Sequence, residues 1–349
     1  MQAYKKRGFW VGLGVFFLVI LSSNPESLSP IGWAVAAVTL LMAIWWATEA
    51  VPVAVTALLP LALFPLLQVT DFKAAALPYA NPNIYLFMGG FILALGIESS
   101  GLHKRLALKM LILVGNSGAK LVGGFMLVSA VISMWVMNTS TTLMLLPIGL
   151  AVCASVAETI PNFSAKQRKN FETSLLLGIA YAASIGGMST LVGTAPNIIF
   201  AAFMLETYGI EISFIDWMKL GVPIASIMLV ASWYTITKFV YPVNFVASME
   251  TKLQLRNMLT DLGPLGRDEK KVLVIFLFAA GAWMFRTLLD NFVPLSGLTD
   301  AGIAILAALS FFFIPSENNK TDLLTWEQAN KLPWGLLVLF GGGLSLAAS

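Results

Sequence analysis

The sequence has few charged residues, one cysteine and one histidine. Only 11% of its 349 residues are Asp, Glu, Lys or Arg, against about a quarter in soluble globular proteins. The single Cys153 excludes a framework of disulfide bonds within the chain, and the single His103 leaves too few ligands for a Cys/His metal cage. A Ser/His/Asp hydrolase triad would have to use His103, which we expect in a wet, basic loop beside Lys104 and Arg105. A net charge of +3 gives no indication of nucleic-acid binding.

The chain is instead rich in apolar residues. Hydrophobic side chains make up 58% of the sequence and the mean hydropathy is +0.83, so most of its surface is expected to face lipid. Apolar runs of suitable length predict membrane spans near 9–22, 31–48, 51–67, 84–100, 172–204, 216–241, 272–290, 299–314 and from 334 onward. We therefore expect an all-α polytopic membrane protein.

Basic residues occur in alternate loops between these spans. The cluster at 5–7 precedes the first span, which we interpret as a retained helix rather than a cleaved signal, and it places the N-terminus in the cytoplasm. The alternation continues only if the apolar stretch 117–157 enters and leaves on the cytoplasmic side, because a single crossing would put the basic loop 166–169 outside. The sequence thus predicts a re-entrant hairpin, with two arms of about 16 residues that each reach part way through the bilayer.

The middle of this hairpin is polar. Six hydroxyl or amide side chains lie within the ten residues 133–142. A polar seam between packed helices is one interpretation. Asn138 favours a binding site, because an amide in hydrocarbon is costly unless it has partners.

A second interruption is predicted in the span 172–204. Gly186, Gly187, Gly193 and Pro196 fall within a short part of it, and we expect Gly193 and Pro196 to unwind the helix. A proline kink filled by a neighbouring helix is the alternative. An unwound turn offers carbonyl oxygens to Na⁺, and two interrupted segments are typical of a transporter site near the bilayer midplane. Neither break carries Lys or Arg, so an anion would be held by neutral donors, helix N-termini and co-bound cations.

Several motifs along the whole chain resemble the divalent anion:sodium symporter family, whose members carry di- and tricarboxylates or sulfate. The matching segments are Trp46–Pro52, Leu86–Gly90, the Asn138-Thr139 tip, Gly193–Asn197, and Pro333–Gly335 leading to Leu339–Gly343. In that family the hairpin tip carries a Ser-Asn-Thr triplet that contacts sodium and a substrate carboxylate. Here Met137 stands where the serine would be, which leaves part of the sodium shell and the substrate preference open.

The resemblance implies a set of binding residues. The sodium ligands it implies are Ser133, the backbone of Met137, Asn138 and Gly193. The substrate contacts it implies are Asn138, Thr139, Thr194 and Pro196. It also implies an elevator-type transporter that works as a homodimer, with sodium as coupling ion and no other cofactor.

The resemblance further implies an inverted repeat. Residues 86–96 placed over 339–349 give six identities in eleven positions, at a shift of 253. The partner of the first tip would then lie near position 390, so we expect a C-terminally truncated chain that holds about half of the binding site. The expected parts are 1–83 as scaffold helices, 84–116 as a span plus cytoplasmic amphipathic linker helix, 117–157 and 172–204 as transport-domain hairpin and broken helix, 205–271 as scaffold helix and cytoplasmic loop, and 272–349 as the start of the second repeat.

The function expected from these features is transport rather than catalysis. A C4 dicarboxylate such as succinate, malate or fumarate would cross the cytoplasmic (inner) membrane together with sodium. A sodium-independent dicarboxylate exchanger, or transport of sulfate, citrate or tartrate, remains open. An intramembrane enzyme is not expected, because the breaks provide Ser, Thr and Asn but no general base. Of the other polar residues, Glu49 is expected exposed at a helix end, Arg286 paired with Asp290, and Asp300 at the interface.

Overall fold

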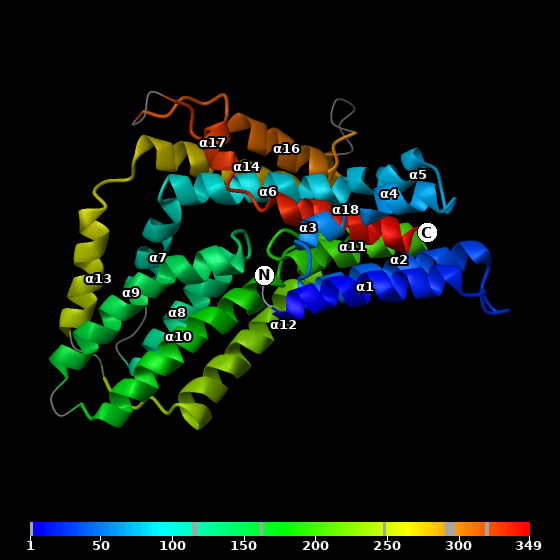
Figure 1. Ribbon diagram of the computed structural model, residues 1–349. Helices are drawn as coiled ribbons and strands as arrows, with labels where there is room; N and C mark the ends of the chain where they lie inside the picture. Colours follow the sequence, from blue (N-terminus) through cyan, green and yellow to red (C-terminus); the bar gives the residue numbers. More distant parts are fainter. Residues whose placement is uncertain (1–2, 114–116, 161–162, 247–248, 290–296, 318–320) are drawn as a thin grey trace. The chain divides into compact units, whose positions relative to one another are not determined.

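The computed structural model describes residues 3–113, 117–160, 163–246, 249–289, 297–317 and 321–349 (Figure 1). These residues form helices joined by turns and loops, and within them β-structure is limited to two isolated bridges. The predicted all-α class is therefore confirmed.

Most of the predicted spans coincide with helices. In the first half they are α1 (Ala3–Leu21), α2 (Pro30–Thr48), α3 (Val53–Thr56), α4 (Leu59–Leu66), α5 (Phe72–Ala76), η1 (Leu77–Ala80), α6 (Pro82–Ser99), α7 (Leu102–Leu113), α8 (Gly118–Ser133) and α9 (Asn138–Thr159). In the second half they are α10 (Ala165–Gly187), α11 (Ala195–Tyr208), α12 (Phe214–Tyr234), η2 (Thr235–Val240), α13 (Met249–Asp261), α14 (Arg267–Met284), α15 (Arg286–Leu289), α16 (Asp300–Ser310), α17 (Trp326–Ala329) and α18 (Trp334–Ala347).

Four helical segments of the described chain are long and apolar enough to cross a membrane. They are Pro30–Thr48, Phe72–Ser99, Asn138–Thr159 and Phe214–Val240. Shorter apolar helices accompany them, among them α8, α16 and α18. Together with the composition, these segments identify a polytopic membrane protein.

The chain divides into two compact units. One comprises Met1–Met88, Ile199–Glu211 and Asn330–Ser349, and the other comprises Gly89–Ile198 and Ile212–Ala329. We call them the first and the second unit. The second unit holds the hairpin 117–157 together with most of 205–271, a part that the sequence predicts to belong to the scaffold. Which parts move and which stay fixed during transport stays a prediction.

In the first unit, α1 and α2 form an antiparallel pair. Lys5 near the start of α1 and Glu49 after the end of α2 form an ion pair of 2.9 Å. This contact puts the N-terminus and the α2–α3 turn at the same end of the pair, as the charge pattern predicts. Glu49 is exposed, as expected, and its φ of 45° ends α2 in the left-handed region.

The predicted span 51–67 is apolar and helical, but it is interrupted. It consists of two short helices, α3 and α4, with Pro52 as the N-cap of α3 and Pro60 in the first turn of α4. Proline is tolerated at these places but cannot continue a preceding helix, which explains the interruption.

The first unit also contains a contact between two residues that the predicted repeat makes equivalent. Phe87 of α6 and Phe340 of α18 differ by the shift of 253, and their rings pack with centroids 5.3 Å apart. Contact of a residue with its own equivalent is what a two-fold axis between two elements produces. The inverted repeat itself stays a prediction.

In the second unit, α8, α9 and α10 lie side by side (Figure 1). A Cβ on Gly186 of α10 would collide with the backbone of Ala130 on α8, so only glycine permits this close approach. Ser129 of α8 donates a hydrogen bond of 2.7 Å to the carbonyl of Ile179 on α10. Helix α8 therefore packs closely on α10, through a glycine contact with its backbone and through the short side chain of Ser129.

The stretch 117–157 forms a helical hairpin, with α8 and α9 joined by the short turn 134–137. Helix α8 has 16 residues, as predicted. Helix α9 has 22 and is longer than the predicted arm. The hairpin's position in the bilayer stays a prediction.

Candidate functional site

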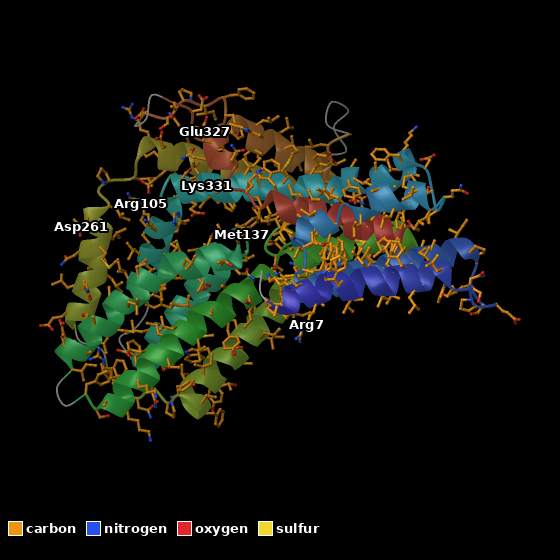
Figure 2. All side chains as sticks on the ribbon, viewed as in Figure 1. Arg7, Arg105, Met137, Asp261, Glu327 and Lys331 are labelled. Atoms are coloured by element: carbon orange, nitrogen blue, oxygen red, sulfur yellow. The ribbon has the colours of Figure 1, made fainter. Side chains whose placement is uncertain are left out.

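The site begins at the hairpin tip, where α8 ends at Ser133 and α9 begins at Asn138. The hydroxyl of Ser133 is fully buried and donates a hydrogen bond of 2.6 Å to Oδ1 of Asn138. Met137, labelled in Figure 2, occupies the N-cap position of α9. Its side chain makes no capping hydrogen bond. Its carbonyl oxygen accepts the N–H of Thr141 at 2.9 Å. The tip thus carries neutral oxygen atoms and a helix N-terminus without a side-chain cap.

The second interruption lies between α10 and α11. Helix α10 ends at Gly187, α11 begins at Ala195, and residues 188–194 between them are not α-helical. Gly193 lies inside this break, as predicted. Pro196 does not unwind the helix, because it occupies the first turn of α11, where a missing N–H costs nothing.

Glycine allows the break to approach the tip. A Cβ on Gly187 would lie 2.5 Å from Oδ1 of Asn138 and 3.1 Å from the carbonyl oxygen of Gly193. A Cβ on Gly193 would collide with the carbonyl of Gly187. Three oxygens therefore gather in one place, from the Asn138 amide and the two glycine carbonyls. We call Ser133, Asn138, Gly187 and Gly193 the oxygen cluster.

Two polar side chains hold the break in place by hydrogen bonds, and neither is among the predicted site residues. Thr190 donates to the carbonyl of Met134 in the tip, and its hydroxyl accepts the N–H of Gly193 at 3.1 Å. The amide of Asn197 donates to the carbonyls of Gly187 at 2.9 Å and of Thr190 at 2.7 Å. Carbonyls freed at the end of α10 are thereby partly satisfied. The sequence offered one signal for Asn197, namely an amide side chain in an apolar segment directly after a proline.

The structure brings the predicted sodium ligands together. Ser133 and Asn138 share a hydrogen bond, Gly193 lies across from Asn138, and Met137 precedes it in the chain. Of the predicted substrate contacts, Thr139 is exposed on the first turn of α9. Thr194 is half-buried at the end of the break, and Pro196 is exposed on the first turn of α11. These three lie at the starts of two helices, where N–H groups face outward along the axis. Their contact with substrate stays a prediction.

An aromatic cluster supports the tip. Trp135 stacks with Phe214 and Trp283 at centroid distances of 5.8 and 6.3 Å and meets Phe276 edge-on at 4.9 Å. The indole N–H of Trp283 donates to the carbonyl of Asp300 at 3.0 Å. The rigid indole of Trp135 thus anchors the turn 134–137 in the second unit.

Asp300, whose carbonyl accepts the indole N–H of Trp283, is buried at the start of α16. Its predicted place at the membrane interface stays a prediction. Its carboxylate accepts the backbone N–H of Phe214 at 2.9 Å and forms an ion pair of 3.2 Å with Arg286. Asp290, the partner first expected for Arg286, lies outside the described residues. The buried carboxylate fixes the start of α12 beneath the tip.

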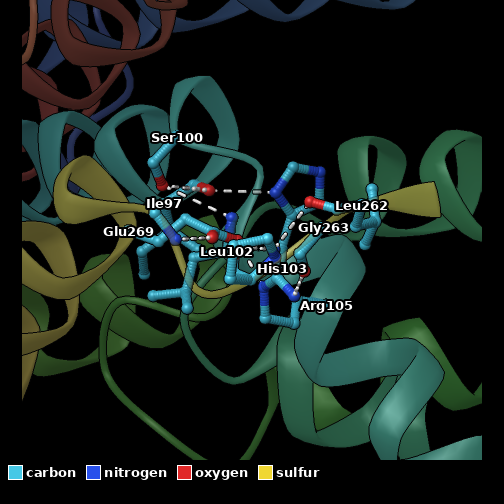
Figure 3. Close-up of polar contacts among 10 residues, drawn as sticks. Ile97, Ser100, Leu102, His103, Arg105, Leu262, Gly263 and Glu269 are labelled. Carbon is cyan, nitrogen blue, oxygen red and sulfur yellow. Dashed lines mark hydrogen bonds and ion pairs between the residues drawn. The ribbon is translucent and has the colours of Figure 1, made fainter. Parts of the chain in front are cut away.

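A second polar cluster joins α7, α13 and α14 (Figure 3). Arg105 donates from Nε to Glu269 at 2.8 Å, and from its other nitrogens to the carbonyls of Gly263 at 2.8 Å and of Leu262 and Pro264 at 3.1 Å. The other carboxylate oxygen of Glu269 accepts the N–H of Gly266 at 2.7 Å. We call this arrangement the Arg105 junction.

His103 stands next to the Arg105 junction and is not in a wet loop, so that prediction is wrong. It belongs to α7, is 6% exposed, and its Nδ1 lies 2.9 Å from the carbonyl of Ile97. Burial lowers the pKa of His103 below its ordinary value, despite the opposing hydrogen bond to Ile97. Helix α7 is amphipathic as predicted, with Lys104 and Lys109 exposed, but Arg105 lies on its buried face.

Comparison with known proteins agrees with these features. A family model described as the sodium:sulfate symporter transmembrane region matches residues 7–349. The sodium-dependent dicarboxylate transporter SdcS of Staphylococcus saprophyticus is 38% identical over 348 residues, which cover 97% of this chain and 66% of the relative. The protein of the same name from Staphylococcus aureus is 38% identical over 346 residues, with the same shares covered. The chain thus spans 66% of the length of these relatives. By the match over nearly its whole length, the chain belongs to the sodium:sulfate symporter family.

Proposed function

We propose that the protein is a secondary active transporter that moves a C4 dicarboxylate together with sodium across the cell's inner membrane. Family membership supports transport of a divalent anion, and the names of the two relatives support a dicarboxylate and dependence on sodium. The proposal covers activity, substrate and coupling ion alike.

The observation that carries the proposal is the oxygen cluster, where two helix interruptions meet without a charged side chain. A dianion bound beside neutral groups in a low-dielectric site needs compensating charge. Sodium held by Ser133, Asn138 and the carbonyls of Met137 and Gly193 would supply that charge. The substrate carboxylate would then contact Asn138, Thr139, Thr194 and Pro196, near the positive ends of α9 and α11.

The distribution of basic residues supports a cytoplasmic N-terminus and a hairpin that is re-entrant from that side. The family resemblance supports an elevator motion of the hairpin-bearing transport domain against a scaffold in a homodimer. The contact between Phe87 and Phe340 supports the inverted repeat that the resemblance implies.

A sodium-independent exchanger is the second candidate, and Met137 favours it. The tip lacks the hydroxyl of the family's serine, and the thioether of Met137 is a poor ligand for a hard cation. The backbone carbonyl of Met137 can still serve, so the two candidates differ in a measurable way.

Uptake of radiolabelled succinate into proteoliposomes with the full-length protein tests the proposal. An inward sodium gradient should accelerate uptake several-fold over an equal gradient of choline. Uptake that ignores sodium but requires internal succinate would establish the exchanger instead. Excess unlabelled sulfate, citrate or tartrate identifies the preferred anion, since only a transported or bound anion competes. Proteoliposomes that take up none of these anions under either gradient would contradict transport of this class.

A further inference from the structure

Thr141 lies on α9, one helical turn beyond Asn138. Its side chain is fully buried, and its hydroxyl makes no hydrogen bond to any of the described residues. Threonine within a helix commonly donates to the carbonyl four residues earlier. The next residue, Thr142, does this, with a bond of 2.8 Å to the carbonyl of Asn138. The two neighbouring threonines therefore differ in how their hydroxyls are used.

The position of Thr141 in α9 puts it one helical turn from Asn138 of the oxygen cluster. Residues three apart in a helix lie on one face, about 5–6 Å between their Cβ atoms, so Thr141 shares the face of Asn138. Farther along the same face, a Cβ on Gly149 would lie 3.3 Å from Ile179 of α10 and 3.9 Å from Phe125 of α8. The face of α9 that carries Gly149 therefore packs against α8 and α10, and Thr141 itself is fully buried.

A buried hydroxyl that makes no hydrogen bond is costly, and such an atom calls for a specific explanation. Several features indicate a cation. The surrounding polar atoms are a serine hydroxyl, an amide oxygen and carbonyls, which are the ligands that hard cations prefer. Met137 contributes only its carbonyl, which leaves this tip one oxygen short of a tip that carries serine. Thr141 lies one helical turn from Asn138, and its hydroxyl oxygen has both lone pairs unused.

We propose that the hydroxyl oxygen of Thr141 is a further ligand of the sodium ion bound at the oxygen cluster. The inference rests on the proposed function, because it concerns the same coupling ion. It assigns the missing oxygen of the tip to a residue deeper in the hairpin and explains how a tip with methionine retains sodium.

The test measures sodium binding without transport. The full-length protein in detergent is heated in increasing NaCl, with choline chloride keeping the ionic strength constant, and the half-saturating sodium concentration is read from the rise in Tm. For Thr141→Val, which removes the oxygen at nearly constant shape, we expect this concentration to rise about tenfold or more. Without sodium, its Tm should be equal to or above wild type, because an unpartnered buried hydroxyl has gone.

Three further variants keep the test decisive. Thr141→Ser keeps the hydroxyl and should retain the sodium midpoint of wild type. Thr142→Val removes a hydroxyl that bonds back to its own helix and should also retain it. Thr141→Cys replaces oxygen by sulfur and should weaken sodium binding, which covers the case in which the valine variant does not fold.

The outcomes separate this inference from the function on which it rests. A wild-type sodium midpoint in Thr141→Val or Thr141→Cys overturns the inference, as does an equal loss in Thr141→Ser, which would indicate packing. If the wild-type protein shows no stabilisation that is specific to sodium, sodium coupling itself fails, and with it the ligand role of Thr141.

Discussion

At the Arg105 junction a full positive charge is buried, whereas at the oxygen cluster every side chain is neutral. Both clusters lie in the second unit, and both join segments far apart in the sequence. Arg105 and Glu269 are separated by 164 positions and hold each other at 2.8 Å. Ser133 and Asn138 face Gly187 and Gly193 across the tip and the break.

The difference lies in how completely the polar atoms are used. Arg105 has five N–H donors and four acceptors around it, and both oxygens of Glu269 accept hydrogen bonds. A charge compensated in this way stabilises one geometry and has little capacity left for a ligand. In the oxygen cluster, the Ser133 hydroxyl, the Asn138 amide oxygen and the two glycine carbonyls accept few bonds and have lone pairs to spare. We therefore expect the Arg105 junction to support the fold and the oxygen cluster to bind the ligand.

The largest effect is expected from Asn138→Ala, because the amide would contact both sodium and substrate. We expect sodium-driven succinate uptake to fall to the level of protein-free liposomes, while the amount of inserted protein stays that of wild type. The measurement is initial uptake of labelled succinate, normalised to reconstituted protein.

Asn170→Ala is the matched control for this change. Asn170 lies on α10 and donates to the carbonyl of Pro242 at 3.3 Å, away from the oxygen cluster. It should transport at the wild-type rate. Wild-type uptake by Asn138→Ala would show that the oxygen cluster is not the binding site. The two clusters would then not divide support and binding between them.

The next largest effect is expected from Arg105→Ala, and it concerns stability. The change leaves the carboxylate of Glu269 buried without its partner, which typically costs about 3–5 kcal/mol. Carbonyls 262–264 lose their donors as well. We expect a markedly lower Tm in detergent, with little change in the sodium midpoint of the protein that remains folded.

Lys104→Ala serves as the control, since Lys104 is the exposed neighbour on α7 and should change stability by less than about 0.5 kcal/mol. If Arg105→Ala and Lys104→Ala had equal Tm values, the junction would not be the support that its hydrogen bonds indicate.

The two clusters also differ in how far the sequence could predict them. The break at Gly193 and the turn before Asn138 were predictable, because glycine, proline and polar residues interrupt apolar helices by local chemistry. The hairpin was predictable because basic residues occur in alternate loops, and this alternation continues only if the stretch 117–157 turns back. These signals act within a few residues or along the whole chain.

The Arg105 junction could not be predicted in this way. Its partners are brought together only by packing of α7, α13 and α14, and a basic run of three residues gave no sign that its last member is buried. The same holds for Asp300, whose partner Phe214 lies 86 positions away. Buried charges in an otherwise apolar chain are decided by tertiary contacts, which local pattern does not contain.

The smallest expected effect is a difference in pH dependence. Burial tends to raise the pKa of Glu269, but the hydrogen bonds from Arg105 and the N–H of Gly266 outweigh it, and the pKa lies below the ordinary 4.5. The stability from this carboxylate is therefore present above about pH 4.5 and is lost as the pH falls through the lower value of the folded protein. Burial lowers the pKa of His103 below 6.5, so its contribution is lost earlier, as the pH falls from about 6.5.

We expect Tm to decline in these two windows on acidification, and His103→Gln to remove the first decline while Glu269→Gln removes the second. The sodium midpoint, measured between about pH 5 and 8 in the same samples, should stay constant, because the hydroxyl, amide and carbonyl ligands of the oxygen cluster do not titrate in that range. A sodium midpoint that follows the His103 window would mean that the junction and the tip are coupled. The charged cluster would then contribute to binding as well as to support.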